Sequence, residues 1–181
     1  ARAVAERFPD LPRFLGGWWA SSVPELELAT GLWDAVAVGQ GEITFHELVQ
    51  AVDAGTPLDD VAGLALVRDG AVVRTPPRRI VGWGELPDCP WDLIDLAEYR
   101  DQQLGARPAR EMSRMMAPPG YNGKPFWGIT YFSSFGCPEP CTFCCSPEMT
   151  GLRWKAQPAE RMVDDLCALH ERWGFQTVRF F

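Results

Sequence analysis

The sequence predicts an α/β fold class, and three observations support that prediction. Two short apolar strands near the start of the chain are each followed by closely spaced glycines, at Gly16-Gly17 and at Gly39-Gln40-Gly41. Strand–glycine loop–helix units in tandem favour a doubly wound parallel sheet that binds ligands at the carboxyl ends of its strands. Residues 124–181 then read as strand, cysteine-containing loop, helix and strand, which is one right-handed βαβ unit.

Bulk composition limits the classes of function. The 181 residues are 46% apolar, which is enough for a hydrophobic core. A net charge of −7 argues against a general binder of nucleic acid or of membrane surfaces. No run approaches the roughly 18 apolar residues of a membrane span, and no signal-peptide pattern is present. Six cysteines, three of them in one metal-like loop, suit a reducing compartment, so we expect a cytoplasmic protein.

The first strands belong to two consecutive units. Residues 1–8 read as the end of a helix, and residues 12–15 form a strand that leads into Gly16-Gly17. Residues 34–38 form the second strand, and the helix after Gly41 ends at a C-terminal cap, Gly55. Helical spacing predicts the apolar face of that helix to be Phe45, Leu48, Val49 and Val52.

The pattern of strand, glycine loop and helix does not continue after residue 61. Residues 63–74 read as a hairpin around an Asp69-Gly70 turn, which we interpret as a decorative hairpin at the sheet edge. Residues 75–79 break the pattern, and polar, Pro-containing residues 101–123 are predicted to be a linker.

The last part of the chain reads as a βαβ unit. Residues 126–131 are a buried strand, Pro158 opens a helix that Gly174 closes, and residues 175–181 are the next strand. The residues at helical spacing are Ala159, Met162, Val163, Leu166, His170 and Trp173. Because the chain begins inside a helix and ends on a strand without a partner, we expect an internal piece of a longer enzyme.

Cys137, Cys141 and Cys144 are the most informative residues of the chain. Three thiolates in one short loop are what ligation of an iron–sulfur cluster requires, and an electron-transfer cluster normally takes four. Three cysteines leave one iron open, where a substrate can bind. Their spacing also differs from the ferredoxin runs and from the paired Cys-x2-Cys knuckles of zinc sites.

Two other readings of this loop stay open. One is a structural zinc loop with Cys145 as the fourth thiolate, although adjacent cysteines usually point apart in extended chain. The other is a ferredoxin-like site with four thiolates. We interpret Cys89 and Cys167 as ordinary buried thiols.

The loop resembles that of the radical S-adenosylmethionine (radical SAM) enzymes, with Phe143 as the aromatic residue before the third cysteine. The resemblance implies that Cys137, Cys141 and Cys144 hold a 4Fe–4S cluster whose open iron chelates SAM, and that Phe143 lies near the adenine. It implies cleavage of SAM to a 5′-deoxyadenosyl radical, an external one-electron donor of the flavodoxin or ferredoxin type, and a small-molecule or natural-product substrate.

Two upstream stretches resemble the cobalamin-binding domain that precedes many radical SAM modules: Gly16-Gly17-Trp18, Ser21 and Pro24-Glu25, then Asp34-Ala35-Val36 and Gly39-Gln40-Gly41-Glu42. The resemblance implies that both glycine loops line the nucleotide tail of cobalamin, with contacts from Gly16, Gly17, Gly39, Gln40, Gly41 and Glu42. Many relatives carry histidine where this chain has Trp19, and the Asp-x-His-x-x-Gly stretch that supplies a lower axial ligand is not present.

The two resemblances together imply the C-terminal part of a Rossmann-like cobalamin-binding domain at residues 1–100, the linker at 101–123, and the first βαβ unit of a radical SAM partial (β/α) barrel at 124–181. They imply methylation of an unactivated carbon, or cyclisation on the same architecture. No catalytic side chain is assigned, and we expect this piece alone to be inactive. Two alternatives are a radical SAM enzyme whose upstream domain has lost cobalamin, and a non-catalytic, zinc-stabilised binding module.

Overall fold

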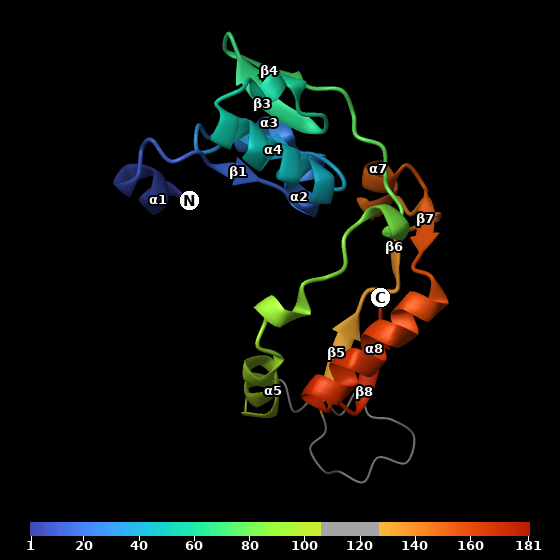
Figure 1. Cartoon of the computed structure of the whole chain (residues 1–181). Helices are drawn as coiled ribbons and strands as arrows, with labels where there is room; N and C mark the ends of the chain where they lie inside the picture. Colours follow the sequence, from blue (N-terminus) through green and yellow to red (C-terminus); the bar gives the residue numbers. More distant parts are fainter. Residues whose placement is uncertain (106–126) are drawn as a thin grey trace. The chain divides into compact units, whose positions relative to one another are not determined.

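The computed structural model describes residues 1–105 and 127–181, which form two compact units (Figure 1). The first unit combines Ala1–Val81 with Gly136–Trp154, and the second combines Gly82–Phe135 with Lys155–Phe181. Most of the expected linker, from residue 106 to 123, and Phe126 of the expected strand lie outside the described residues. The division of the chain into domains at residues 100 and 124 stays a prediction.

The first unit contains a four-stranded sheet in the order β1-β2-β3-β4. β1 (Phe14–Leu15) and β2 (Ala35–Ala37) run parallel, as the tandem strand–glycine units predict. β3 (Leu64–Arg68) pairs antiparallel with β2, and β4 (Ala71–Arg74) pairs antiparallel with β3. The α/β class is therefore confirmed, but the sheet is mixed instead of wholly parallel.

Helices cover both faces of this sheet because its strands are apolar on both sides. α4 (Glu42–Ala54) packs on one face, and α2 (Trp18–Ser22) and α3 (Pro24–Leu28) pack on the other. The buried cluster on the α4 face comprises Ala35, Leu48, Ala51, Val61, Leu64 and Leu66. The cluster on the opposite face comprises Ala20, Leu28, Val36 and Ala65. The alternation along β2 and β3 is the period of two expected of strands.

The apolar face predicted for α4 is wrong at three of its four positions. Leu48 is fully buried, but Phe45, Val49 and Val52 are exposed. The buried stripe instead runs through Leu48, Ala51 and Thr44, whose hydroxyl donates to the carbonyl of Ala62. A polar side chain can occupy the core face here because its hydrogen bonds are made inside the protein. Gly55 caps the helix in the left-handed conformation, as predicted.

The hairpin predicted at residues 63–74 is confirmed, but it is not decorative. Leu64, Ala65 and Leu66 of β3 are 1% exposed or less and contribute to both buried clusters. Of the two hairpin strands, β4 is the one at the edge of the sheet, and its side chains are exposed. The unbroken apolar run at the start of β3 is the pattern of a strand covered on both faces.

The second unit is built on a parallel pair, β5 (Gly128–Tyr131) and β8 (Thr177–Phe180), with α8 (Ala159–Trp173) between them in the chain. The predicted βαβ arrangement is therefore confirmed. Its buried residues are Trp127, Ile129, Tyr131, Leu169 and Phe175.

The caps of α8 are those predicted, with Pro158 at its start and a left-handed Gly174 at its end. Its buried face differs from the prediction, because Ala159, Val163 and His170 are exposed and Leu169, which was not predicted, is in the core. His170 is a satisfied structural side chain, with Nδ1 2.7 Å from the carbonyl oxygen of Phe175.

The remaining elements are short: α1 (Arg2–Arg7), η1 (Leu58–Asp60), η2 (Trp83–Glu85), η3 (Trp91–Leu93), α5 (Leu96–Gly105), α7 (Ser146–Thr150), and the paired strands β6 (Ser134–Gly136) and β7 (Trp154–Ala156). Within the part of the chain that the structure describes, none of the helices has the length and apolar character needed to span a membrane.

Candidate cofactor-binding site

The two glycine loops lie side by side in the first unit. Because β1 and β2 are parallel and pair Leu15 with Val36, the loops that follow them leave the same edge of the sheet. A Cβ built on Gly16 would lie 3.7 Å from the Cβ of Ala37. The structure therefore brings together the first glycine loop (residues 16–17) and the second glycine loop (residues 39–41), as expected.

The main chain of these loops has open space beside it. A Cβ built on Gly17 or on Gly41 would meet no heavy atom within 4 Å. Gly17 and Gly39 have φ values of +96° and +85°, in a region that side-chain-bearing residues rarely adopt. Exposed backbone in glycine-only conformations is suited to close approach by a large ligand, so the loops fit the cofactor tail that the resemblance implies.

The side chains of the second loop differ in what they offer a ligand. Gln40 is buried, and its Oε1 accepts a hydrogen bond of 2.7 Å from the backbone N–H of Val81. Glu42, in contrast, is exposed in the first turn of α4. Cobalamin contacts by either residue stay a prediction.

The cysteine loop (residues 137–145) is held at both ends by tight packing. Before it, Gly136 has a φ of +85°, and a Cβ there would lie 2.0 Å from the carbonyl oxygen of Arg153. After it, α7 carries the fully buried Thr150, whose hydroxyl donates to the carbonyl of Ser146 at 2.8 Å. The ends of the loop are therefore determined by close packing and by a hydrogen bond, while the loop between them is largely exposed.

The three predicted ligands are accessible on this loop. Cys137 is half-buried, and Cys141 and Cys144 are exposed. The N–H of Cys144 donates to the carbonyl of Cys141 at 3.1 Å, which makes a turn between them. The N–H of Ser146 is 3.4 Å from the Sγ of Cys144. Backbone hydrogen bonds to sulfur are a recognised way of tuning thiolate ligands, so the donor set fits an iron–sulfur cluster.

The thiols are not preassembled around one point. Among the side chains that the structure describes, no three of His, Cys, Asp or Glu converge as a metal ion would require. Cys145 is half-buried at the end of the cysteine loop, and Phe143 is 91% exposed. Their assignments, like those of the three cysteines, stay predictions.

Cys89 and Cys167 are both exposed, so the prediction that they are buried thiols is wrong. Cys167 lies on α8 beside the buried Leu169 but outside its core face, and Cys89 lies between Pro87 and Pro90 in an irregular segment. His46 is exposed on α4.

The cysteine loop and the glycine loops belong to the same compact unit. α7, which follows the cysteine loop, packs against α2, which follows the first glycine loop. A Cβ built on Gly39 would lie 4.0 Å from the carbonyl oxygen of Met149 in α7. The residues predicted to hold two cofactors are thus neighbours within one packed unit.

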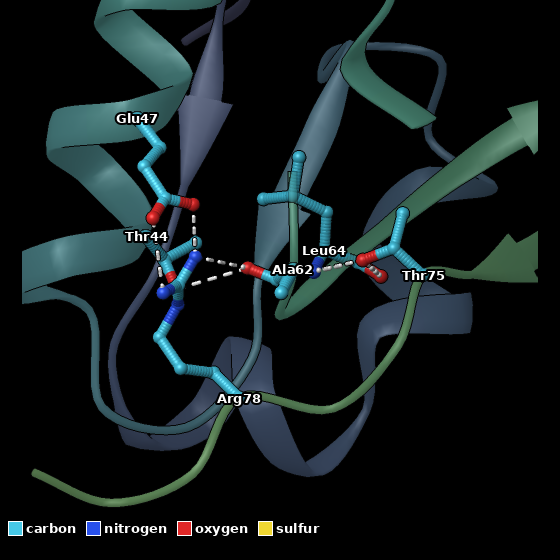
Figure 2. Close-up of polar contacts among 6 residues, drawn as sticks. All are labelled: Thr44, Glu47, Ala62, Leu64, Thr75 and Arg78. Atoms are coloured by element: carbon cyan, nitrogen blue, oxygen red, sulfur yellow. Dashed lines mark hydrogen bonds and ion pairs between the residues drawn. The ribbon is translucent and has the colours of Figure 1, made fainter. Parts of the chain in front are cut away.

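A partly buried polar network, which no sequence pattern indicated, holds the chain beyond β4 (Figure 2). Arg78 donates through Nε to the hydroxyl of Thr44 at 2.7 Å, pairs with the carboxylate of Glu47, and reaches the carbonyl of Ala62. Nearby, the hydroxyl of Thr75 accepts from the N–H of Leu64 at 2.9 Å. No periodic signal could have indicated Arg78, because it lies in an irregular segment.

Comparison with known proteins finds similarity over nearly the whole chain. No family model matches. The chain is 32% identical over 168 residues to an uncharacterized methyltransferase of Pyrococcus horikoshii, a match that covers 92% of the chain and 32% of that protein. It is 25% identical over 174 residues to the anaerobic magnesium-protoporphyrin IX monomethyl ester cyclase of Synechocystis, covering 96% of the chain and 30% of the cyclase.

Among solved structures, the radical SAM methyltransferase TsrM of Kitasatospora setae has the same fold, with a TM-score of 0.65 and 19% identity over 97% of this chain and 30% of TsrM. TsrM has been solved with tryptophan substrate and a SAM analogue, and with cobalamin and a [4Fe-4S] cluster. These matches confirm that the chain is similar to radical SAM enzymes that bind cobalamin. The chain spans about a third of the length of the curated relatives it matches.

Proposed function

We propose that this chain is the part of a cobalamin-dependent radical SAM enzyme that holds its metal cluster and part of its cobalamin site. The observation that carries the proposal is the placement of the cysteine loop and both glycine loops in one compact unit. A zinc module would need no such neighbouring pair of glycine loops, and a loop used only for electron transfer would need a fourth thiolate.

The residues of the chain have distinct roles in this proposal. Cys137, Cys141 and Cys144 supply three thiolates from a loop whose exposure leaves room for SAM at the fourth position. Phe143, with 91% of its surface free, supplies an aromatic face for the adenine. When bound, the cluster supplies the electron that cleaves SAM to a 5′-deoxyadenosyl radical, and cobalamin supplies a carrier for the methyl group.

The glycine loops act through their backbone. Gly16, Gly17, Gly39 and Gly41 leave the main chain accessible to the cofactor's nucleotide tail, and their positions at the carboxyl ends of parallel strands are where α/β sheets bind ligands. Gln40 and Glu42 complete the second loop. An external flavodoxin or ferredoxin would deliver the electron, and the cytoplasm would keep the thiols reduced.

The reaction that we propose is methylation of an unactivated carbon in a small molecule. Similarity to a methyltransferase and the fold shared with TsrM support this choice. Cyclisation is the second candidate, because the chain is also similar along 96% of its length to a cyclase.

The proposal is tested on the full-length protein under anaerobic conditions, by measuring 5′-deoxyadenosine released from SAM with a chemical reductant. Alanine at Cys137, Cys141 or Cys144 should each abolish the product. Cys145→Ala is the matched control, because it removes the adjacent thiol and should leave SAM cleavage intact. Equal loss in the Cys145 variant would favour a four-thiolate site and contradict the proposal.

A further inference from the structure

The second glycine loop is held by a hydroxyl that comes from the helix after the first glycine loop. Ser21 of α2 is 6% exposed, and its Oγ accepts a hydrogen bond of 3.1 Å from the N–H of Gly39. The same hydroxyl donates to the carbonyl of Ala37 at 3.4 Å. One side chain therefore bridges the last carbonyl of β2 and the first amide of the loop, using both its donor and its acceptor capacity.

The other anchor of the loop is Gln40. Its side chain runs inward, is 8% exposed, and accepts from the N–H of Val81 at 2.7 Å. Val81 is itself 5% exposed and follows the segment that Arg78 fastens to Thr44 and Glu47 of α4 (Figure 2). Gln40 therefore binds a backbone amide in a part of the chain whose position the contacts of Arg78 already restrain.

These anchors matter because the loop has few restraints of its own. Gly39 and Gly41 have no side chains, and glycine loses more conformational freedom on ordering than any other residue. If the loop is already ordered before the ligand arrives, binding does not have to reduce its conformational entropy. Preorganisation raises affinity in this way. Both anchors reach the loop from within the protein and leave the open side of Gly41 clear.

We propose that Ser21 and Gln40 are positioning residues that hold residues 39–41 in the shape that receives the nucleotide tail of cobalamin. This inference rests on the proposed function. Neither side chain needs to touch the cofactor for this role. Loss of either anchor should weaken cobalamin binding by about tenfold, the size expected when a buried amide loses its hydrogen-bond partner.

The test is a titration of the full-length protein with hydroxocobalamin, followed by the corrinoid absorption bands, for Ser21→Ala and Gln40→Met. Ser22→Ala is the matched control, because that hydroxyl donates to the carbonyl of Trp18 in its own helix, at 3.0 Å, and not to the second glycine loop. Ser21→Thr keeps a hydroxyl and should restore most of the affinity. Thermal unfolding of each apoprotein separates weaker binding from general loss of the fold.

A second readout does not depend on the cofactor. Hydrogen exchange of a peptide that contains the Gly39 amide should speed up in Ser21→Ala and stay unchanged in Ser22→Ala. If the wild type binds hydroxocobalamin and both anchor variants bind it equally well, the positioning role is overturned and the proposed function stands. If the wild type binds no corrinoid, the proposed function fails and this role fails with it, even where the exchange of Gly39 still responds to Ser21→Ala.

Discussion

Arg78 donates its Nε–H to the hydroxyl of Thr44 across 2.7 Å, and this bond joins the segment beyond β4 to the buried side of α4. Thr44 is fully buried, and its hydroxyl also donates to the carbonyl of Ala62. The packing is tight enough that a Cβ on Gly63 would lie 2.8 Å from the Thr44 oxygen. The network lets a threonine and an arginine occupy positions that apolar residues would otherwise fill.

We expect Arg78→Met to lower the free energy of unfolding by about 2 kcal/mol, because it removes the donor to Thr44 and the partner of Glu47 while keeping an apolar stem in place of the aliphatic part of arginine. Urea unfolding measures the change. Arg74→Met is the control, because its ion pair with Glu25 is exposed on both sides and should contribute little. Equal effects of the two variants would contradict the structural role of Arg78.

Gly136→Ala should prevent the cysteine loop from adopting its structure. Besides the positive φ of residue 136, the new Cβ would meet the carbonyl oxygen of Arg153 at 2.0 Å, so the backbone on one side must move. We predict a strong loss of iron bound after anaerobic reconstitution, measured per chain. Gly84→Ala is the control, because a Cβ there meets no heavy atom within 4 Å. Unchanged iron content in Gly136→Ala would show that the cysteine loop still binds iron when the backbone at residue 136 has a different conformation, which contradicts the prediction.

Much of this architecture could be predicted from local patterns. The βαβ unit, the parallel pair with its glycine loops and the caps at Gly55 and Gly174 all follow from signals within a few residues. The buried faces of helices were harder, because burial depends on what packs against them. Val163 is apolar but exposed, whereas Thr44 is polar and fully buried.

In the candidate site, too, local sequence patterns indicate some features, while others depend on contacts between distant residues. The spacing of the cysteines and glycines indicates chemistry that a single stretch of chain can encode. The anchors that hold the loops join residues far apart in the sequence, such as Ser21 with Gly39 and Gln40 with Val81. Long-range hydrogen bonds leave no periodic signal, so these roles required the structure.

We expect the free energy of unfolding of the second unit to fall at alkaline pH, because Tyr131 ionises. Burial, followed by the hydrogen bond that its hydroxyl donates to Asp165 at 2.7 Å, raises the pKa of Tyr131 to about 12 from its ordinary value of 10.0. Because the folded pKa lies above the unfolded one, this contribution is complete below pH 10 and is lost as the pH rises through about 12.

Urea unfolding at a series of alkaline pH values tests this assignment. Wild type should lose stability relative to Tyr131→Phe between pH 10 and 12. In a pH titration of the folded wild type, the tyrosinate absorbance should include a late ionisation step near pH 12 that the variant lacks. Tyr99→Phe, which removes the hydroxyl of an exposed side chain, should keep that step. A late step that survives in Tyr131→Phe would assign it to another group.

We predict that the 181-residue chain by itself does not turn over SAM. It spans about a third of the length of its curated relatives, and the later barrel strands implied by the resemblance would hold SAM and substrate. Product analysis of the reconstituted chain, with the full-length protein as positive control, measures this. Release of 5′-deoxyadenosine by the chain alone would contradict the prediction.

The most direct test of the account is anaerobic reconstitution with iron and sulfide, followed by iron analysis and electron paramagnetic resonance of the reduced sample with and without SAM. We predict four irons per chain and a spectrum that changes when SAM is added, because the three thiolates of Cys137, Cys141 and Cys144 leave one iron open. A colourless protein that holds one tightly bound zinc would contradict it and leave a structural module.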